Sequence, residues 1–318
     1  MSKADYQESG NVDLQVDLAG IKLKKPVLLA SGPAGYGHEY RELLDFKDLG
    51  AIIVKGVSLE PWAGNPPPRL VETSCGLLNA VGLQNPGLDY FLKEDLPALQ
   101  DSGTKIIVNV VGCNVDEYAA VASRLDGKEG IEGLEINISC PNVKAGGMAF
   151  GTDPEVTARL VEQVRRKTEL PLFIKLSPNV TDINTMAKAA EAAGADGLTL
   201  INTLAGMLID TEEQKPLLGN TFGGLSGPAI MPVALKMVWQ AAGAVKIPVL
   251  GMGGINSAVD ALQFIMAGAR AVAVGTGLFY NPGLPGEINK GLAGYLQEKG
   301  YKSLTEIEGI ARGQKGEN

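Results

Sequence analysis

The chain has 318 residues, of which 45% are hydrophobic and 20% charged, and its formal net charge is −8. At this length roughly three quarters of the surface of the unfolded chain can be buried, so a complete core needs no disulfide or structural metal. An acidic chain with only 5% aromatic residues lacks the basic surface and the stacking platforms of nucleic-acid-binding proteins. Its mean hydropathy is +0.08, and no run of about 18 apolar residues predicts a membrane-spanning helix.

The chain has three cysteines and one histidine, and both counts limit its chemistry. Cys75, Cys113 and Cys140 are widely spaced, which is typical of a reducing cytosol and does not match the ligand spacing of an iron–sulfur cluster. A zinc site with several histidines is impossible, and His38, in a predicted loop, is a poor candidate for a catalytic base. The polar first residues contain no signal-peptide core. We therefore expect a cytoplasmic protein with no metal of its own.

Eight short apolar runs recur along the chain, each bounded by turn residues. Most are apolar throughout rather than alternating, which is typical of parallel strands covered on both faces. In chain order the expected strands lie at residues 27–31, 51–56, 105–110, 134–139, 172–177, 198–202, 248–254 and 271–276.

Amphipathic helical patterns lie between several of these strands. Asp153 and Pro154 are typical of a helix cap followed by a first turn, and apolar residues follow them at helical spacing. Asp182 and Asn256 are expected to begin two further helices, each of which ends at a glycine. A helix that ends in glycine and leads into a buried strand is the expected junction between repeated βα units.

Eight strands alternating with helices in about 250 residues predict a single (β/α)8 TIM barrel, within the α/β class. We place this domain at residues 12–318 and an extra segment at residues 1–11. The alternative is an open doubly wound sheet, which a GxGxxG motif after the first strand would favour. The sequence there is SGPAGYG, which lacks that spacing. The connections after the second, fourth and sixth strands are long, and such loops on the C-terminal rim of a barrel usually build a site.

Each predicted strand ends in a polar residue or a glycine, and in a barrel all of these positions lie on one rim. They are Ser31, Gly32, Lys55, Gly56, Asn109, Asn137, Lys175, Asn202, Gly253, Gly254, Gly275 and Thr276. Polar residues commonly end strands, but lysine is rarely buried without an anionic partner. The two lysines therefore indicate an anionic ligand, or a cofactor that becomes anionic. The glycines after the last two strands indicate a phosphate site.

Two loops carry further candidates. Cys140 follows the fourth strand in the sequence SCPN, where a reactive group could be exposed, although most cysteines are inert buried thiols. Asn79 and Asn85, in the sequence NAVGLQNPG, could hydrogen-bond a planar polar ring or could simply form a turn. The other two cysteines are interpreted as structural.

Six motifs, in this order along the chain, resemble those of the flavin-dependent dihydroorotate dehydrogenases of pyrimidine biosynthesis. They are NAVGLQNPG, NISCPNVKAGGMAFGTDP, IKLSPNVTDI, INTLAG, GGLSGPA and GMGGI, and the likeness extends from about Val12 to Leu304. The cysteine in SCPN and the lack of a hydrophobic N-terminal extension differ from the membrane-associated class 2 enzymes, and the loop NVKAGGMAFGTDP resembles the NAD-linked class 1B catalytic subunit more than the class 1A enzymes. The alternatives are the fumarate-linked class 1A enzymes and related FMN-dependent pyrimidine reductases.

The resemblance implies a barrel with one FMN at the C-terminal rim and dihydroorotate beside it. The residues implied to contact FMN are Ser31, Lys55, Gly56, Asn109, Asn137, Lys175, Ile201, Gly227, Gly253, Gly254, Gly275 and Thr276, and the last four would hold the phosphate. Those implied to contact dihydroorotate are Lys55, Asn79, Ala80, Val81, Gly82, Leu83, Asn137, Asn142, Asn202 and Thr203. Cys140 would be the base that removes a proton from C5, while a hydride leaves C6 for the flavin.

The resemblance also implies a protein partner. Electrons that reach FMN must leave again, yet the chain has neither a second dinucleotide fingerprint nor a cysteine cluster. Class 1B enzymes pair this subunit with one that carries FAD and a [2Fe–2S] cluster, in a heterotetramer built on a homodimer. Two hypotheses from other classes are a phosphate-binding barrel isomerase or synthase without flavin, and an inactive scaffold that kept the fold. Purified protein without the yellow colour of flavin would favour the flavin-free isomerase or synthase.

Overall fold

The computed structural model describes residues 12–138 and 150–313. The eight expected strands form a closed parallel barrel in the order β10-β15-β16-β3-β4-β7-β8-β9. Their bounds are β3 Val27–Leu29, β4 Ala51–Val57, β7 Lys105–Val110, β8 Ile131–Asn137, β9 Leu172–Lys175, β10 Gly197–Leu200, β15 Val249–Met252 and β16 Ala271–Val274. The last strand pairs with the first, so the (β/α)8 prediction is confirmed and the open-sheet alternative is wrong.

The barrel strands are buried on both faces, as their apolar sequences predict. Every residue of β9, β10, β15 and β16 is buried, because side chains that point inward fill the barrel and those that point outward meet the surrounding helices. In the described residues one large core cluster joins barrel and helices, and a second, small cluster of Leu78, Ala80 and Leu218 lies apart from it.

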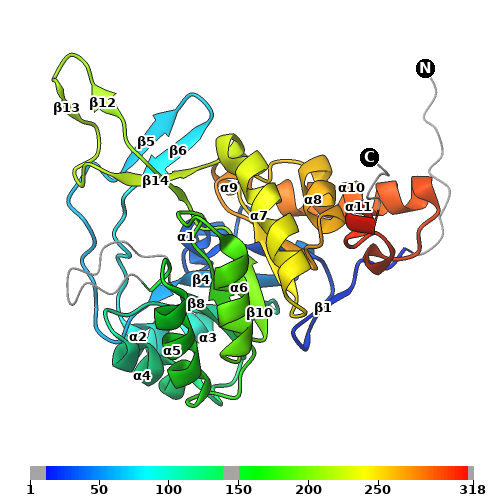
Figure 1. Cartoon of the computed structure of the whole chain (residues 1–318), viewed down its shortest axis with the longest axis horizontal. Helices are drawn as coiled ribbons and strands as arrows, with labels where there is room; N and C mark the ends of the chain where they lie inside the picture. The colour runs from blue at the N-terminus through cyan, green and yellow to red at the C-terminus, as the bar shows by residue number, and fades with distance from the viewer. Residues whose placement is uncertain (1–11, 139–149, 314–318) are drawn as a thin grey trace.

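Helices surround the barrel and alternate with its strands (Figure 1). The longer helices are α4 Val115–Leu125, α5 Pro154–Arg165, α6 Ile183–Ala192, α7 Met231–Ala244, α8 Ala258–Met266 and α10 Leu284–Lys299. The shorter ones are α1 Ser31–Ala34, α2 Leu88–Tyr90, α3 Leu96–Gln100, α9 Gly277–Tyr280 and α11 Ile310–Gly313. No helix among the described residues is both long enough and apolar enough to cross a membrane.

The predicted helix starts are correct in two of three cases. The side chains of Asp153 and Asp182 accept backbone hydrogen bonds at the first turns of α5 and α6. The prediction for α8 is wrong by one residue, because Ser257 is the cap and its hydroxyl accepts from the Asp260 N–H at 3.1 Å. Asn256 instead donates its own backbone N–H to the Asp260 carboxylate at 3.0 Å.

The long connections after the second and sixth barrel strands build a second sheet outside the barrel. Its strand order is β11-β14-β6-β5, with bounds Leu204–Gly206, Gly223–Ser226, Gly76–Asn79 and Leu70–Thr73. Figure 1 shows this sheet projecting away from the barrel, with the hairpin of β12 Ile209–Asp210 and β13 Lys215–Pro216 at its tip. A further hairpin, β1 Val16–Leu18 and β2 Ile21–Leu23, precedes the barrel.

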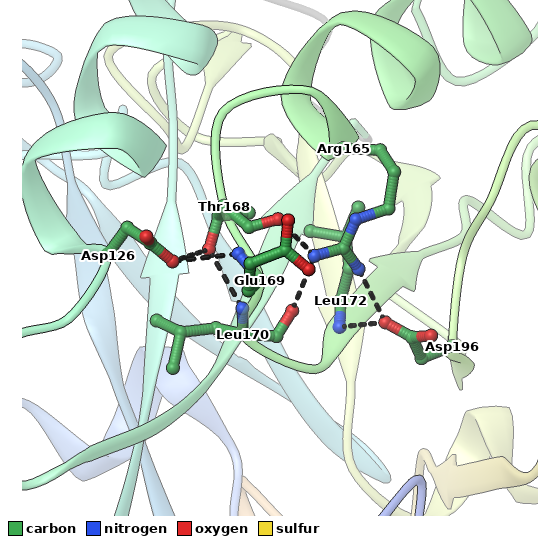
Figure 2. A network of polar contacts seen from close by, with 7 residues as sticks. All are labelled: Asp126, Arg165, Thr168, Glu169, Leu170, Leu172 and Asp196. Carbon is green, nitrogen blue, oxygen red and sulfur yellow. Dashed lines mark hydrogen bonds and ion pairs between the residues drawn. The ribbon is translucent and has the colours of Figure 1, made fainter.

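A polar network fixes the amino-terminal end of β9, the end opposite the rim (Figure 2). Asp126 accepts hydrogen bonds from the Thr168 hydroxyl at 2.7 Å and from the Glu169 N–H at 2.8 Å. These bonds favour the charged carboxylate and hold the pKa of Asp126 below its usual range. Beside it, Arg165 forms an ion pair with Asp196 at 2.7 Å.

Candidate active site

The carboxyl ends of neighbouring strands bring the predicted polar residues together. The strand register pairs Asn137 of β8 with Lys175 of β9, and Asn109 of β7 with Glu135 of β8. All four side chains are buried, although each is polar or charged. Because buried polar groups must find partners, their contacts define the base of the site.

Lys175 forms an ion pair inside the chain with Glu135, a residue that was not among the predicted site residues. The lysine Nζ lies 3.3 Å from Oε1 of Glu135, whose side chain has no exposed surface. Nζ also donates to the Ser31 hydroxyl at 3.1 Å. Lys175 thus has an anionic partner, but the chain itself supplies that anion, whereas the prediction was an anionic ligand or cofactor. Lys175 is therefore not by itself evidence for an anionic ligand.

A continuous row of hydrogen bonds crosses the rim from β7 to the residues after β10. Asn109 donates to Oε1 of Glu135 at 2.5 Å. Asn137 donates to the Asn109 side-chain oxygen at 3.5 Å, and Asn202 donates to that of Asn137 at 3.4 Å. The oxygen of Asn202 then accepts the backbone N–H of Thr203 at 2.8 Å. Since a carboxylate only accepts hydrogen bonds, Glu135 sets the direction of this row.

The glycines after β15 and β16, together with Thr276, form a group of backbone N–H groups at the rim. Among the backbone hydrogen bonds of the described residues, none has as its donor the N–H of Gly253, Gly254, Gly275 or Thr276. Gly253 and Gly254 have φ values of +123° and +78°, which favour glycine. A Cβ on Gly254 would lie 2.9 Å from the carbonyl oxygen of Gly227. Positions 253 and 254 therefore need glycine. The N–H groups of all four residues suit an anion such as phosphate.

The predicted residues Gly227 and Ile201 border these donors. Gly227 has a φ of +94°, and a Cβ there would lie 2.7 Å from the Cα of Gly76, so glycine lets the outer sheet approach the barrel. The side chain of Ile201 is buried, and its Cγ1 would lie 3.3 Å from a Cβ on Gly253. The peptide bond between Leu200 and Ile201 is cis.

Lys55 and Gly56 lie in β4, next to Asn109. A Cβ on Gly56 would lie 3.2 Å from the Asn109 side-chain oxygen, so this glycine leaves room for the amide row. Burial lowers the pKa of the Lys55 ammonium, an effect that Glu39 opposes and Arg69 reinforces. Lys55 is thus a half-buried cation near the rim, as an anionic ligand would require.

The outer sheet contributes the predicted segment 79–83. Asn79 donates its side-chain amide to the Gly224 carbonyl at 3.1 Å, and Ala80 is buried. The following segment, Val81 to Leu83, includes positive φ values of +75° at Gly82 and +54° at Leu83. Whether this segment touches a ligand remains a prediction.

The side chain of Asn85 supports the turn in which it lies. Its side-chain oxygen accepts from the Ser58 hydroxyl at 2.9 Å and from the Gly87 N–H at 2.9 Å, and its amide donates to the Leu83 carbonyl at 2.9 Å. These contacts agree with the turn alternative for Asn85, whereas its contact with a planar ring stays a prediction.

Two further residues shape the rim without having been predicted. Asn179, after β9, donates to the Thr203 carbonyl at 3.2 Å and accepts from the Ala205 N–H at 2.9 Å. Ser226, at the end of β14, accepts the hydroxyl of Thr276 at 2.8 Å. Asn179 and Ser226 lie in the motifs IKLSPNVTDI and GGLSGPA, which were noted in the sequence. Glu135 could have been found from the sequence as well, because it is a charged residue inside the apolar run LEINIS.

The remaining candidates divide into those inside and those outside the described residues. Cys140 and Asn142 lie outside them. Cys113 is partly buried, and burial together with Glu117 raises the pKa of its thiol, which agrees with a structural interpretation. Cys75 is exposed. Nε2 of His38 lies within hydrogen-bond distance, 2.8 Å, of Oδ1 of Asp95.

Comparisons with known proteins place the whole barrel in one family. A family model described as "Dihydroorotate dehydrogenase" matches residues 13–296. The relatives include proteins named "Dihydroorotate dehydrogenase B (NAD(+)), catalytic subunit". That of Desulforudis audaxviator is 57% identical over 300 residues, which cover 94% of this chain and 98% of the relative. Those of Alkaliphilus metalliredigens and Geotalea uraniireducens are 53% and 54% identical, with the same coverage.

Proposed function

Since the chain belongs to the dihydroorotate dehydrogenase family, we propose that it is the catalytic subunit of an NAD-linked dihydroorotate dehydrogenase. The proposed reaction oxidises (S)-dihydroorotate to orotate in the biosynthesis of UMP. A hydride leaves C6 and a proton leaves C5, so the ring gains a carbon–carbon double bond. We propose residues 12–318 as the catalytic domain, acting in the cytoplasm.

The observation that carries this proposal is the pairing, on one rim, of the amide row with the group of glycine N–H donors. The backbone donors at Gly253, Gly254, Gly275 and Thr276 fit a terminal monophosphate. The buried ion pair and amides between β7 and β9 fit a planar ring with alternating N–H and C=O groups. The residues present therefore fit FMN.

FMN, when bound, supplies the hydride acceptor that no protein side chain provides. We assign its phosphate to the glycine donors after β15 and β16, bordered by Gly227 and Ile201. We assign its ring system to Ser31, Lys55, Gly56, Asn109, Asn137 and Lys175. A cation near the ring stabilises the charge that develops on reduction.

The substrate is proposed to lie against the outer sheet. Lys55 holds its carboxylate, and the amides of Asn79, Asn137 and Asn202 bind the ring, which offers both N–H and C=O groups. The segment 80–83, Asn142 and Thr203 complete the proposed contacts. A half-buried ammonium favours an anionic substrate over a neutral one.

Cys140 is proposed as the general base. Its thiolate takes the proton from C5 and is thereby neutralised, while the C6 hydride leaves from the neighbouring carbon. A thiol with a free pKa of about 8.5 can serve near neutral pH when its neighbours lower that value.

The word "subunit" in the relatives' names supports a partner for this chain, and we propose its cofactors. The partner carries FAD and a [2Fe–2S] cluster, receives electrons from FMN and passes them to NAD. A homodimer of this chain forms the core of a heterotetramer. The sequence spacing of the three cysteines of this chain does not match the ligand spacing of such a cluster.

The test combines cofactor identification with a comparison of electron acceptors. Mass spectrometry of the denatured supernatant should find FMN, and the chain alone should reduce dyes with dihydroorotate but not NAD. Addition of a subunit with FAD and [2Fe–2S] should restore NAD reduction. Finding FAD on this chain would contradict the phosphate assignment. Rapid NAD reduction by the chain alone would contradict the need for a partner, and rapid turnover with fumarate would indicate a class 1A enzyme instead.

A further inference from the structure

The proposed function gives no role to the carboxylate of Glu135, the most deeply buried acidic group among the described residues. Glutamate is almost never fully buried unless it is paired, and its desolvation is costly even then. The side chain of Glu135 nevertheless has no exposed surface, in the middle of the strand β8. A hydrophobic residue would suit this strand better, so the charge itself calls for an explanation.

The contacts of Glu135 concentrate on one oxygen. Oε1 accepts from Lys175 Nζ at 3.3 Å and from the Asn109 amide at 2.5 Å. Oε2 is buried and has no hydrogen-bond partner among the described residues. The carboxylate is therefore held as the counter-ion of Lys175 and is incompletely satisfied otherwise.

We propose that Glu135 is a positioning residue that lowers the reduction potential of the bound flavin by neutralising Lys175. This inference rests on the proposed function, in which Lys175 lies beside the flavin ring. A cation next to the ring favours the reduced, anionic flavin and so raises its potential. The Glu135 carboxylate opposes that field at short range, in a low-dielectric interior where a counter-charge is strongly felt.

The consequence fits an enzyme whose electrons must reach NAD. A strongly positive site would hold electrons on the flavin and disfavour their transfer to a low-potential acceptor. With Glu135 in place, Lys175 can still orient the ring through its hydrogen bonds, while its charge is balanced. With Glu135 present, Lys175 can thus hold the flavin ring without raising the reduction potential of the flavin.

The substitution Glu135→Gln tests the inference because it removes charge with little change of shape. The glutamine oxygen can accept the same two hydrogen bonds that Oε1 accepts. Glu135→Asp is the charge-retaining variant. Asp196→Asn is the matched control, because it neutralises the partner of Arg165 at the amino-terminal end of β10, opposite the rim (Figure 2).

The measurement is the midpoint potential of the flavin in each purified protein, with dyes as indicators and no substrate present. We expect a rise in Glu135→Gln equivalent to at least about a tenfold relative gain in affinity for reduced over oxidised FMN. That gain corresponds to about 30 mV for a two-electron couple. Glu135→Asp should restore most of the wild-type value, and Asp196→Asn should not differ from wild type.

Three results would overturn the inference. One is a Glu135→Gln potential equal to or below that of wild type. Another is an equal shift in the Asp196→Asn control, and the third is no recovery in Glu135→Asp. A wild-type protein that binds no flavin would instead refute the proposed function, so the two failures are distinguishable.

Discussion

The assignment of the N–H groups after β15 and β16 to the FMN phosphate can be tested at Gly254. The free-energy cost of adding a methyl group at this position can be worked out from the structure. The residue has a φ of +78°, and alanine in that left-handed region costs roughly 1–2 kcal/mol. A Cβ would also lie 2.6 Å from Met231 Cβ and 2.9 Å from the Gly227 carbonyl oxygen. Relieving these contacts requires backbone movement, and overpacking of this kind costs typically 1–3 kcal/mol more.

We therefore expect Gly254→Ala to weaken FMN binding by at least about 30-fold, which corresponds to about 2 kcal/mol. The assay is a titration of apoprotein with FMN, followed by quenching of flavin fluorescence. Gly127→Ala is the matched control, because Gly127 also has a positive φ, +67°, but a Cβ there would meet nothing within 4 Å. It should lose stability of about 1 kcal/mol and keep its FMN affinity. Wild-type FMN affinity in Gly254→Ala would refute the assignment of this loop to phosphate.

Three further predictions concern the base, the half-buried lysine and the amino-terminal network. Cys140→Ser raises the pKa of the proposed base. Flavin reduction by dihydroorotate, measured by stopped flow, should therefore slow by at least about 10²-fold near neutral pH and recover partly at high pH. Rates equal to those of wild type would mean that another residue is the base. Burial lowers the pKa of Lys55, so this side chain should lose its charge at a lower pH than a free lysine. KM for dihydroorotate should therefore begin to rise at a pH below the free-lysine pKa of about 10.4. A KM that does not change up to that pH would argue against a contact between Lys55 and the substrate carboxylate. Asp126→Ala removes hydrogen bonds to a charged group and should cost about 1–3 kcal/mol in the free energy of unfolding near neutral pH. The pKa of Asp126 is lower in the folded than in the unfolded protein. Its stabilising contribution is therefore fully present at a pH above the unfolded pKa of about 3.9, and it is lost as the pH falls through the folded pKa. Urea midpoints of wild type and variant should therefore converge in acid, and a pH-independent difference would contradict the role of the charge.

The barrel could be predicted because its strands are apolar throughout, but their exact ends could not. The predicted strand 27–31 includes Ser31, which begins α1 in the structure. The predicted strand 248–254 includes Gly253 and Gly254, whose positive φ values end the strand at Met252. Side-chain polarity marks the region of a strand end, whereas the end itself depends on backbone hydrogen bonds with neighbouring strands.

The outer sheet was not predicted because its pairing is long-range. β6 pairs with β14, which joins Asn79 to Gly224 across 145 residues of sequence. The four strands are short and three of them contain glycine, so none has a strong local signal. Glu135 was missed for a related reason: its role depends on Lys175, which only the register of β8 and β9 brings near.

The most direct test of the central claim is anaerobic titration of the purified full-length protein with dihydroorotate. If this chain is the catalytic subunit of a dihydroorotate dehydrogenase, the yellow absorbance of its flavin should bleach in proportion to the dihydroorotate added, and orotate should appear in equal amount. A protein that carries FMN but keeps its colour with excess dihydroorotate, while a chemical reductant bleaches it, would contradict the claim.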